Sequence, residues 1–361
     1  METYIPNVIS KRPGSIMIKY ETLNEHINSN PIKLQPGDKI NVFINFEIVL
    51  RNLASEKSIQ DRVNFHKKKL VLEIESSILN IVAHYKAYFN GKYDTKIYLY
   101  HTDLSSRKQQ MSVYNKYYRT YYQNRYMQNP QFKTMGMIMK NTIIPEVELI
   151  LSYIPNSYFL KSKTFDSSII PYIVSTFSEA KNIIITSDVF DTLYLFNPNF
   201  MVIYDNRRFS AGTIMSDIDP IVRSIIKYED PFDLSLFNSE LYYKLLISIK
   251  GSKIRNIRSA KGFGYGKLLK LLRDGIDNDI VLRDFESIDS VIELFPDKYK
   301  EDIKTAFQCS DLGIQYSLLS ETDINEIKSQ IIDKVDTASL EALNNKRFAE
   351  FPINLPGLIN S

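Results

Sequence analysis

Residues 251–272 read GSKIRNIRSAKGFGYGKLLKLL, a turn with glycines at alternate positions followed by a leucine-rich helix. Backbone N–H groups at the start of a helix that follows such a turn form a ready site for a phosphate group. The spacing is not that of a Walker P-loop, because no Ser or Thr follows Lys267. On its own, the segment predicts a turn and a helix start that can bind phosphate, and it leaves the partner open.

Upstream of this segment, short apolar runs alternate with stretches of helical spacing. The runs cover residues 39–45, 95–100, 182–186 and 201–204, and helices are expected over 59–89 and 168–179. Strands that alternate with helices are typical of an α/β fold with a mostly parallel central sheet, whose ligand site lies at the carboxyl ends of the strands. Residues directly after each strand are therefore the first candidates for functional residues.

The composition along the chain indicates several parts. We expect an irregular or short-stranded N-terminal extension (1–38), an α/β core (39–221) with a Tyr-rich insertion at about 107–162, a helical module (222–345) and a Pro-containing tail (346–361). The two terminal parts suit docking segments. The insertion interleaves aromatic residues with cations, which suits stacking on bases and pairing with phosphates. An amphipathic helix that buries the Tyr rings explains the same pattern equally well.

The overall composition is that of an ordinary globular protein. The chain has 361 residues, and its 45 Lys and Arg against 42 Asp and Glu give a net charge of +3, which does not favour strong non-specific DNA binding. The single cysteine, Cys309, excludes an internal disulfide and is expected to be a small core residue in a reducing compartment. We recognise neither a secretion signal nor a long apolar run, so we expect a protein that is not secreted by a signal peptide and does not span a membrane.

With its surroundings, the 251–272 segment resembles the helix-hairpin-helix region of the flap endonuclease and 5′-to-3′ exonuclease family, which is PIN-like. The family pattern runs approximately GDxSDNIPGVPGIGxKTAxxLL, and this chain matches it without a gap at Gly251, Asn256, Ile257, Gly262, Gly264, Leu271 and Leu272. Three further family motifs lie upstream of this segment, in the order that the family has them. Residues 121–125 (YYQNR) are similar to Y-K-x-N-R, residues 165–170 (FDSSII) to E-A-D-D-x-I, and residues 185–193 (ITSDVFDTL) to a strand followed by S-x-D-x-D-x-L. The resemblance covers about 38–340 and implies a mostly parallel sheet flanked by helices, with a C-terminal helical helix-hairpin-helix module.

This family cleaves phosphodiesters with two divalent ions held by a ring of carboxylates, because such ions prefer hard oxygen ligands. In this chain most of the ring is replaced, at Asn45, His101, Phe165, Ser167, Ser168, Val189, Ser252 and Arg255. Asp191 is the one carboxylate at a family position, so it is the catalytic and metal-ligand candidate if the chain has one. A shifted alignment would recover some of the neighbouring carboxylates, of which Asp188 and Asp103 are weak catalytic candidates and Asp166 and Glu47 are further neighbours.

Cations surround the glycine turn where the family has carboxylates. The DNA-binding candidates are Lys253, Arg255, Arg258, Lys261 and Lys267, the backbone of Gly262 and Gly264, and Arg119 and Arg125 in the insertion. Lys and Arg side chains contact phosphates directly, with no metal between them. No cofactor is expected: Mg²⁺ or Mn²⁺ would belong to an active nuclease, and a monovalent cation could bind at the hairpin.

Three functions follow from this pattern. The one we favour is a pseudoenzyme, a non-catalytic flap-endonuclease-like protein that is a structural or DNA-contacting component of a larger bacteriophage assembly, in the bacterial cytoplasm or within the virion. An active metal-dependent 5′-nuclease that acts on flap or single-stranded DNA ends is the second. A purely protein-binding scaffold is the third. The expected partners are DNA and proteins of a viral or replication assembly, with no membrane and no small-molecule substrate.

Overall fold

A computed structural model describes most of the sheet and its flanking helices. The described residues are 18, 20–46, 49, 67–102, 138–186, 190–205, 214–215, 239–250, 260, 262–277, 287–332, 338–339, 341–342, 348 and 353–359. Most of the Tyr-rich insertion and the first half of the glycine-turn segment lie outside this set. Within the set, no helix is both long enough and apolar enough to cross a membrane.

The centre of the molecule is a six-stranded sheet in the order β3-β2-β1-β4-β5-β6. Its strands are β1 (Lys39–Asn45), β2 (Asp94–Thr102), β3 (Ser157–Ser162), β4 (Lys181–Thr186), β5 (Phe200–Asp205) and β6 (Ile214–Met215). Strands β1 to β5 run parallel, and β6 pairs antiparallel with β5. The prediction of a mostly parallel sheet is confirmed, and the four predicted strands are all present.

Strand β3 was not predicted, because it lies within the stretch that was assigned to the Tyr-rich insertion. Its sequence, SYFLKS, contains a lysine and two serines, so it does not form the continuous apolar run that is typical of a buried parallel strand. As the edge strand, β3 pairs on one side only, with β2. The last part of the insertion is therefore part of the central sheet.

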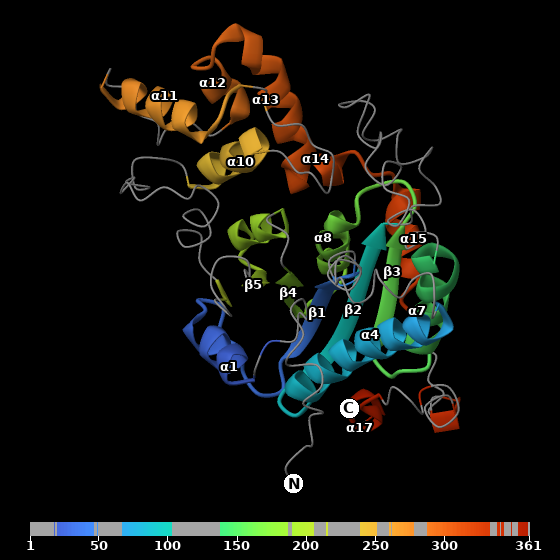
Figure 1. Cartoon of the computed structure of the whole chain (residues 1–361). Helices are drawn as coiled ribbons and strands as arrows, with labels where there is room; N and C mark the ends of the chain where they lie inside the picture. The colour runs from blue at the N-terminus through green and yellow to red at the C-terminus, as the bar shows by residue number, and fades with distance from the viewer. Residues whose placement is uncertain are drawn as a thin grey trace.

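Helices cover both faces of the sheet, as predicted (Figure 1). On one face lie α1 (Tyr20–Ser29), α4 (Lys67–Asn90), the π-helical η2 (Met139–Ile143), α7 (Ile144–Leu151) and α17 (Leu355–Ile359). On the other lie the 3₁₀ helices η3 (Ser167–Ile169) and η4 (Asp191–Phe196), with α8 (Ile170–Ser175), and α10 (Ser239–Lys250) joins the same apolar core from beyond the carboxyl ends of the strands (Figure 1). Side chains alternate between the two cores, since Val42 and Ile44 pack on the α4 side and Phe43 packs on the α8 side.

The C-terminal part is helical in its described residues, as predicted. It contains α10, α11 (Tyr265–Asp277), α12 (Ile288–Ile292), α13 (Asp297–Ser310), α14 (Leu312–Ser317) and α15 (Glu321–Ser329). Figure 1 shows α10 to α14 beyond the carboxyl ends of the strands, and their buried side chains continue the apolar core of the α8 side. Lys244 of α10 joins this group by an ion pair with Asp311, whose other carboxylate oxygen caps α14.

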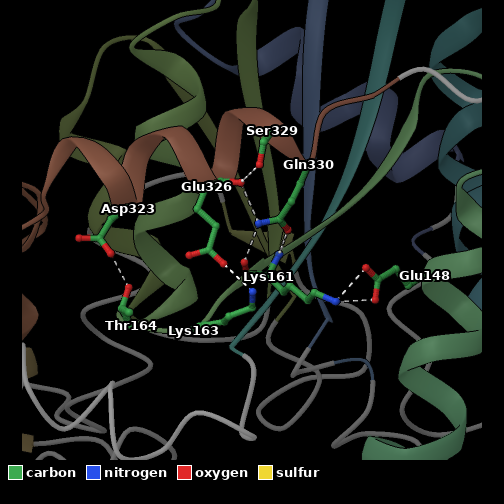
Figure 2. A network of polar contacts seen from close by, with 8 residues as sticks. All are labelled: Glu148, Lys161, Lys163, Thr164, Asp323, Glu326, Ser329 and Gln330. Atoms are coloured by element: carbon green, nitrogen blue, oxygen red, sulfur yellow. Dashed lines mark hydrogen bonds and ion pairs between the residues drawn. The ribbon is translucent and has the colours of Figure 1, made fainter.

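Helix α15 returns to the sheet and covers the exposed edge of β3 (Figure 2). The side-chain amide of Gln330 accepts a hydrogen bond from the Lys161 N–H (2.7 Å) and donates one to the Lys161 carbonyl (3.0 Å). It therefore satisfies the backbone groups that a further strand would otherwise bind. Thr164 donates to Asp323 (2.6 Å), and Lys163 pairs with Glu326 (3.0 Å), so α15 is attached along the end of the strand.

Part of the N-terminal extension is a helix, so the prediction of an irregular or short-stranded extension is wrong for residues 20–29. Leu23 and Ile27 are buried one helical turn apart, a pattern too short to stand out in the sequence. Tyr88 of α4 donates to Asn24 (2.7 Å), and His84 of α4 bonds through Nε2 to the Ile18 carbonyl (2.7 Å). Helix α1 is therefore docked on α4.

The C-terminal tail also packs on α4. The Asn354 N–H donates to Asn80 (2.8 Å), and the buried ammonium group of Lys86 donates to the carbonyls of Leu358 (2.7 Å) and Pro155 (2.6 Å). We expected both terminal parts to serve as docking segments, but their described residues pack on the chain's own core instead.

Replacing Gly357 with Ala should loosen α17 from α4. A Cβ atom at this position would lie 2.7 Å from the Asn354 amide nitrogen and 3.1 Å from the Ala83 carbonyl oxygen, which belongs to the backbone of α4. We expect Gly357→Ala to lower the free energy of unfolding by about 1–3 kcal/mol in urea denaturation. Gly91→Ala is the matched control, because a Cβ atom there meets nothing within 4 Å. Equal stability of the two variants would contradict this packing.

The docking of α1 should be sensitive to acid through His84. Burial lowers the pKa of His84 from 6.5 to about 4, so between these pH values the unfolded chain binds more protons than the native chain. Stability should therefore fall as the pH drops through this window, by roughly 3 kcal/mol in total from this group. In denaturant titrations at pH 7 and pH 4.5, His84→Gln should lose less stability on acidification than the parent chain. Identical pH profiles would contradict the assignment.

Candidate functional site at the carboxyl edge of the sheet

The carboxyl ends of three neighbouring strands bring polar side chains into one row. Asn45 at the end of β1 is in register with Tyr100 of β2, and Thr186 of β4 follows Ile185, the partner of Ile44. Asn45 and Tyr100 lie two residues after Phe43 and Tyr98, which belong to the core on the α8 side. Because side chains on a strand alternate with a period of two, this row faces the same side of the sheet.

Asp191 lies where this row converges. It is the first residue of η4, five residues after Thr186 ends β4, and its side chain has no exposed surface. Its Oδ2 atom accepts hydrogen bonds from Asn45 Nδ2 (2.8 Å), the Tyr100 hydroxyl (3.0 Å) and Thr186 Oγ1 (2.6 Å). A buried carboxylate needs such donors, because burial without hydrogen bonds would strongly disfavour its charged form.

Tyr100, and not His101, is the β2 residue that reaches this carboxylate. The ring of His101 is buried against Phe46 and Phe159, with centroid separations of 5.7 and 6.3 Å, and both phenylalanines belong to the core on the α4 side. The expectation that His101 takes the place of a family carboxylate is therefore corrected by one residue. On a strand, a shift of one residue moves a side chain to the opposite face.

The E-A-D-D-like segment forms η3 beside the end of β2. Thr102 Oγ1 donates to Ser167 Oγ (2.9 Å) and accepts from the Ser167 N–H (3.1 Å), so Ser167, at a position where the family resemblance implies a carboxylate, is buried and close to the sheet edge. The Asp166 carboxylate caps η3 by accepting from the Ser168 N–H (2.9 Å). Phe165 is buried in the core on the α8 side. This segment is therefore held by hydroxyl groups and by one capping carboxylate.

Several predicted site residues lie outside the described residues. They are Glu47, Asp103, Arg119, Arg125, Asp188, Val189, Ser252, Lys253, Arg255, Arg258 and Lys261. Asp188 and Asp103 thus remain predictions as weak catalytic candidates, and six of the DNA-binding candidates also remain untested. Among the residues that the structure does describe, no three His, Cys, Asp or Glu side chains are grouped so that they could hold a metal ion.

The described part of the glycine turn forms an exposed corner at the start of α11. Gly262 has a φ of +84°, in the left-handed region that favours glycine, and the Phe263 N–H closes the turn onto the Ala260 carbonyl (3.0 Å). Gly264 and Lys267 are exposed, and Lys267 Nζ donates to the Gly262 carbonyl (2.6 Å). The structure therefore brings Gly262, Gly264 and Lys267 together at one helix start, as the sequence predicted.

Two lysines flank an aromatic ring at this corner. Lys298 Nζ lies 4.8 Å and Lys267 Nζ 5.9 Å from the centroid of the Tyr299 ring. Hydrogen bonding to Lys298, together with the charges of both lysines, lowers the pKa of Tyr299. The corner is therefore electropositive. Lys298 was not singled out in the sequence, because it comes into place only through the packing of α13 against the turn.

No protein-family model matches the chain, and no curated protein matches its sequence. Similar solved structures come from bacteriophage T5. They include the D15 protein co-crystallised with metal ions (13% identity, 80% of this chain and 97% of that chain, TM-score 0.48) and the 5′-exonuclease with bound zinc ions (11%, 82% and 100%, 0.45). A third is a flap endonuclease pseudo-enzyme-product complex with DNA and metal ions (13%, 81% and 97%, 0.46). These neighbours are of the kind that the sequence motifs resemble.

Removing a single donor to Asp191 should be costly. Thr186→Val keeps the side-chain shape but removes a hydrogen bond to a buried charged group, so we expect a loss of about 2 kcal/mol in the free energy of unfolding. Thr95→Val is the matched control, because Thr95 is also buried on a strand but bonds to the neutral Tyr93 carbonyl. Chemical denaturation of both variants measures the difference, and equal losses would argue against a charged acceptor.

Proposed function

We propose that this chain is a catalytically degenerate, flap-endonuclease-like protein that contacts DNA without cutting it. The observation that carries the proposal is the composition of the carboxyl edge of the sheet. Where the family resemblance implies a ring of carboxylates, the described residues place Asn45, Tyr100, Thr186 and Ser167, with Asp191 bound by three of their side chains. Among the residues that the structure describes, the side chains at this edge are therefore mostly neutral.

Two-metal hydrolysis makes demands that this edge does not meet in its described part. Two divalent ions bring four positive charges, which several carboxylates must balance while also positioning the attacking and leaving oxygens. Amide and hydroxyl side chains are neutral and cannot balance these charges. An active nuclease would need carboxylates from outside the described residues, such as Asp188 and Asp103, and this remains the alternative function.

The exposed corner at the start of α11 favours DNA contact. Backbone N–H groups at the start of a helix, together with the ammonium groups of Lys267 and Lys298, suit a phosphate without a metal. The predicted cations Lys253, Arg255, Arg258 and Lys261 belong to the same segment of the chain and would extend this surface. We propose Gly262, Gly264 and Lys267 as the centre of the contact.

A place in a larger bacteriophage assembly completes the proposal. A nuclease fold that grips DNA without cutting it suits a structural component, either with replication proteins in the bacterial cytoplasm or within the virion. A purely protein-binding scaffold is the remaining alternative, and it requires no DNA affinity at low salt.

Titration against labelled 5′-flap DNA separates these functions. In the presence of EDTA we expect binding that weakens with salt, and on addition of Mn²⁺ we expect the DNA to remain intact. Lys267→Ala should weaken binding and reduce the slope of log affinity against log salt by about one, as expected for the loss of one phosphate contact. Lys39→Ala is the control, because Lys39 is exposed at the amino end of β1, at the opposite edge of the sheet.

Each outcome points to one function. Mn²⁺-dependent cleavage that Asp191→Ala abolishes would establish the active nuclease and overturn the proposal. The absence of any binding at low salt would favour the scaffold. Equal effects of Lys267→Ala and Lys39→Ala would leave DNA binding in place but move it away from the start of α11.

A further inference from the structure

The Asp191 carboxylate, at the carboxyl edge of the sheet, is bound by side chains of three strands. Three donors from three different strands converge on its Oδ2 atom, and all three side chains are neutral. We infer that this donor set takes the place of a divalent cation, and that Asn45 is the residue that makes the edge independent of one. The inference deepens the proposed function, since both interpret this edge as a converted metal site.

The donor set does not fit a divalent ion at this oxygen. Mg²⁺ and Mn²⁺ bind the lone pairs of oxygen ligands, preferably carboxylates and waters. Around Asp191 Oδ2, an amide N–H and two hydroxyl groups already direct their hydrogens at the lone pairs, at 2.6 to 3.0 Å between heavy atoms. An ion at the same place would meet these hydrogens and would have to displace all three donors.

Hydrogen bonds from neutral groups can stabilise the buried charge without an ion. Each hydrogen bond to a charged acceptor contributes more than one between neutral groups, and three of them converge on one oxygen here. They also link the ends of β1, β2 and β4 to η4. The ion's structural role, which is to hold neighbouring strand ends around one point, is thus performed by side chains.

Asn45 is the decisive member because it has the shape of aspartate. In Asn45→Asp a carboxylate oxygen would stand about where Nδ2 now lies, 2.8 Å from Asp191 Oδ2. Two carboxylates this close cannot both stay ionised unless a cation lies between them, and without a cation the pair has to take up a proton. The single change from N–H to O⁻ should therefore convert an ion-independent edge into one that needs an ion.

Thermal unfolding with and without divalent ions tests this inference. For the parent chain, millimolar Mg²⁺, Mn²⁺ or Ca²⁺ should leave the melting temperature within about 1 °C of its value in EDTA at matched ionic strength. For Asn45→Asp, we expect a lower melting temperature in EDTA and a rise of at least about 3 °C with one of the three ions. Asn45→Ala is the control: it also loses the hydrogen bond, but no ion should restore its stability.

Direct binding of Mn²⁺, followed by electron paramagnetic resonance, gives a second measurement, made on the parent chain and on Asp191→Asn. We expect that Asp191→Asn removes no Mn²⁺ binding from the parent chain, because the ion does not bind at Asp191. Such binding would overturn the inference, and so would an Asn45→Asp chain that none of the three ions stabilises, whether it is folded or not. Neither result depends on DNA. The proposed function is tested separately from this inference, since it fails if the parent chain has no affinity for flap DNA.

Discussion

A carboxylate with no exposed surface has to obtain its hydrogen bonds from the protein, and this requirement organises the carboxyl edge of the sheet. Asp191 obtains three from Asn45, Tyr100 and Thr186, so the ends of β1, β2 and β4 must stay in register for the charge to be stabilised. Satisfying one buried charge thus fixes the relative positions of three strands and a helix.

On the opposite face, α4 has a comparable role for the ends of the chain. Its His84 contacts the segment before α1, and its Lys86 joins α17 to the turn before β3 through two carbonyl groups. Burial lowers the pKa of Lys86 to about 8, so this ammonium group keeps its charge at neutral pH at a cost that its two acceptors offset. Segments that lie far apart in sequence are therefore held on one helix.

The sequence was sufficient for the parallel sheet and the helical C-terminal part, because continuous apolar runs such as 182–186 and the leucine-rich helix at 265–277 leave few alternatives. It was not sufficient for β3 or α1, whose patterns are short and interrupted by polar residues. At the site, the motif order identified Asp191 and Asn45, but it gave His101 as the site residue at the end of the second predicted strand. Strand parity, counted from Phe43 and Tyr98, would have pointed to Tyr100 instead.

Around Asp191, the described side chains at the sheet edge are neutral hydrogen-bond donors, whereas the family resemblance implies carboxylates there. An amide and two hydroxyl groups stabilise the single negative charge of one carboxylate without a cation, whereas a ring of carboxylates is stable only when cations are bound to it. An edge of this kind does not attract a cation that bridges to phosphate. In the proposed function, contact with DNA relies on positive charge supplied by side chains, and in the described part of the chain Lys267 and Lys298 supply such charge at the start of α11. In the proposed function, metal-free binding and the loss of cutting are therefore two consequences of one chemical change.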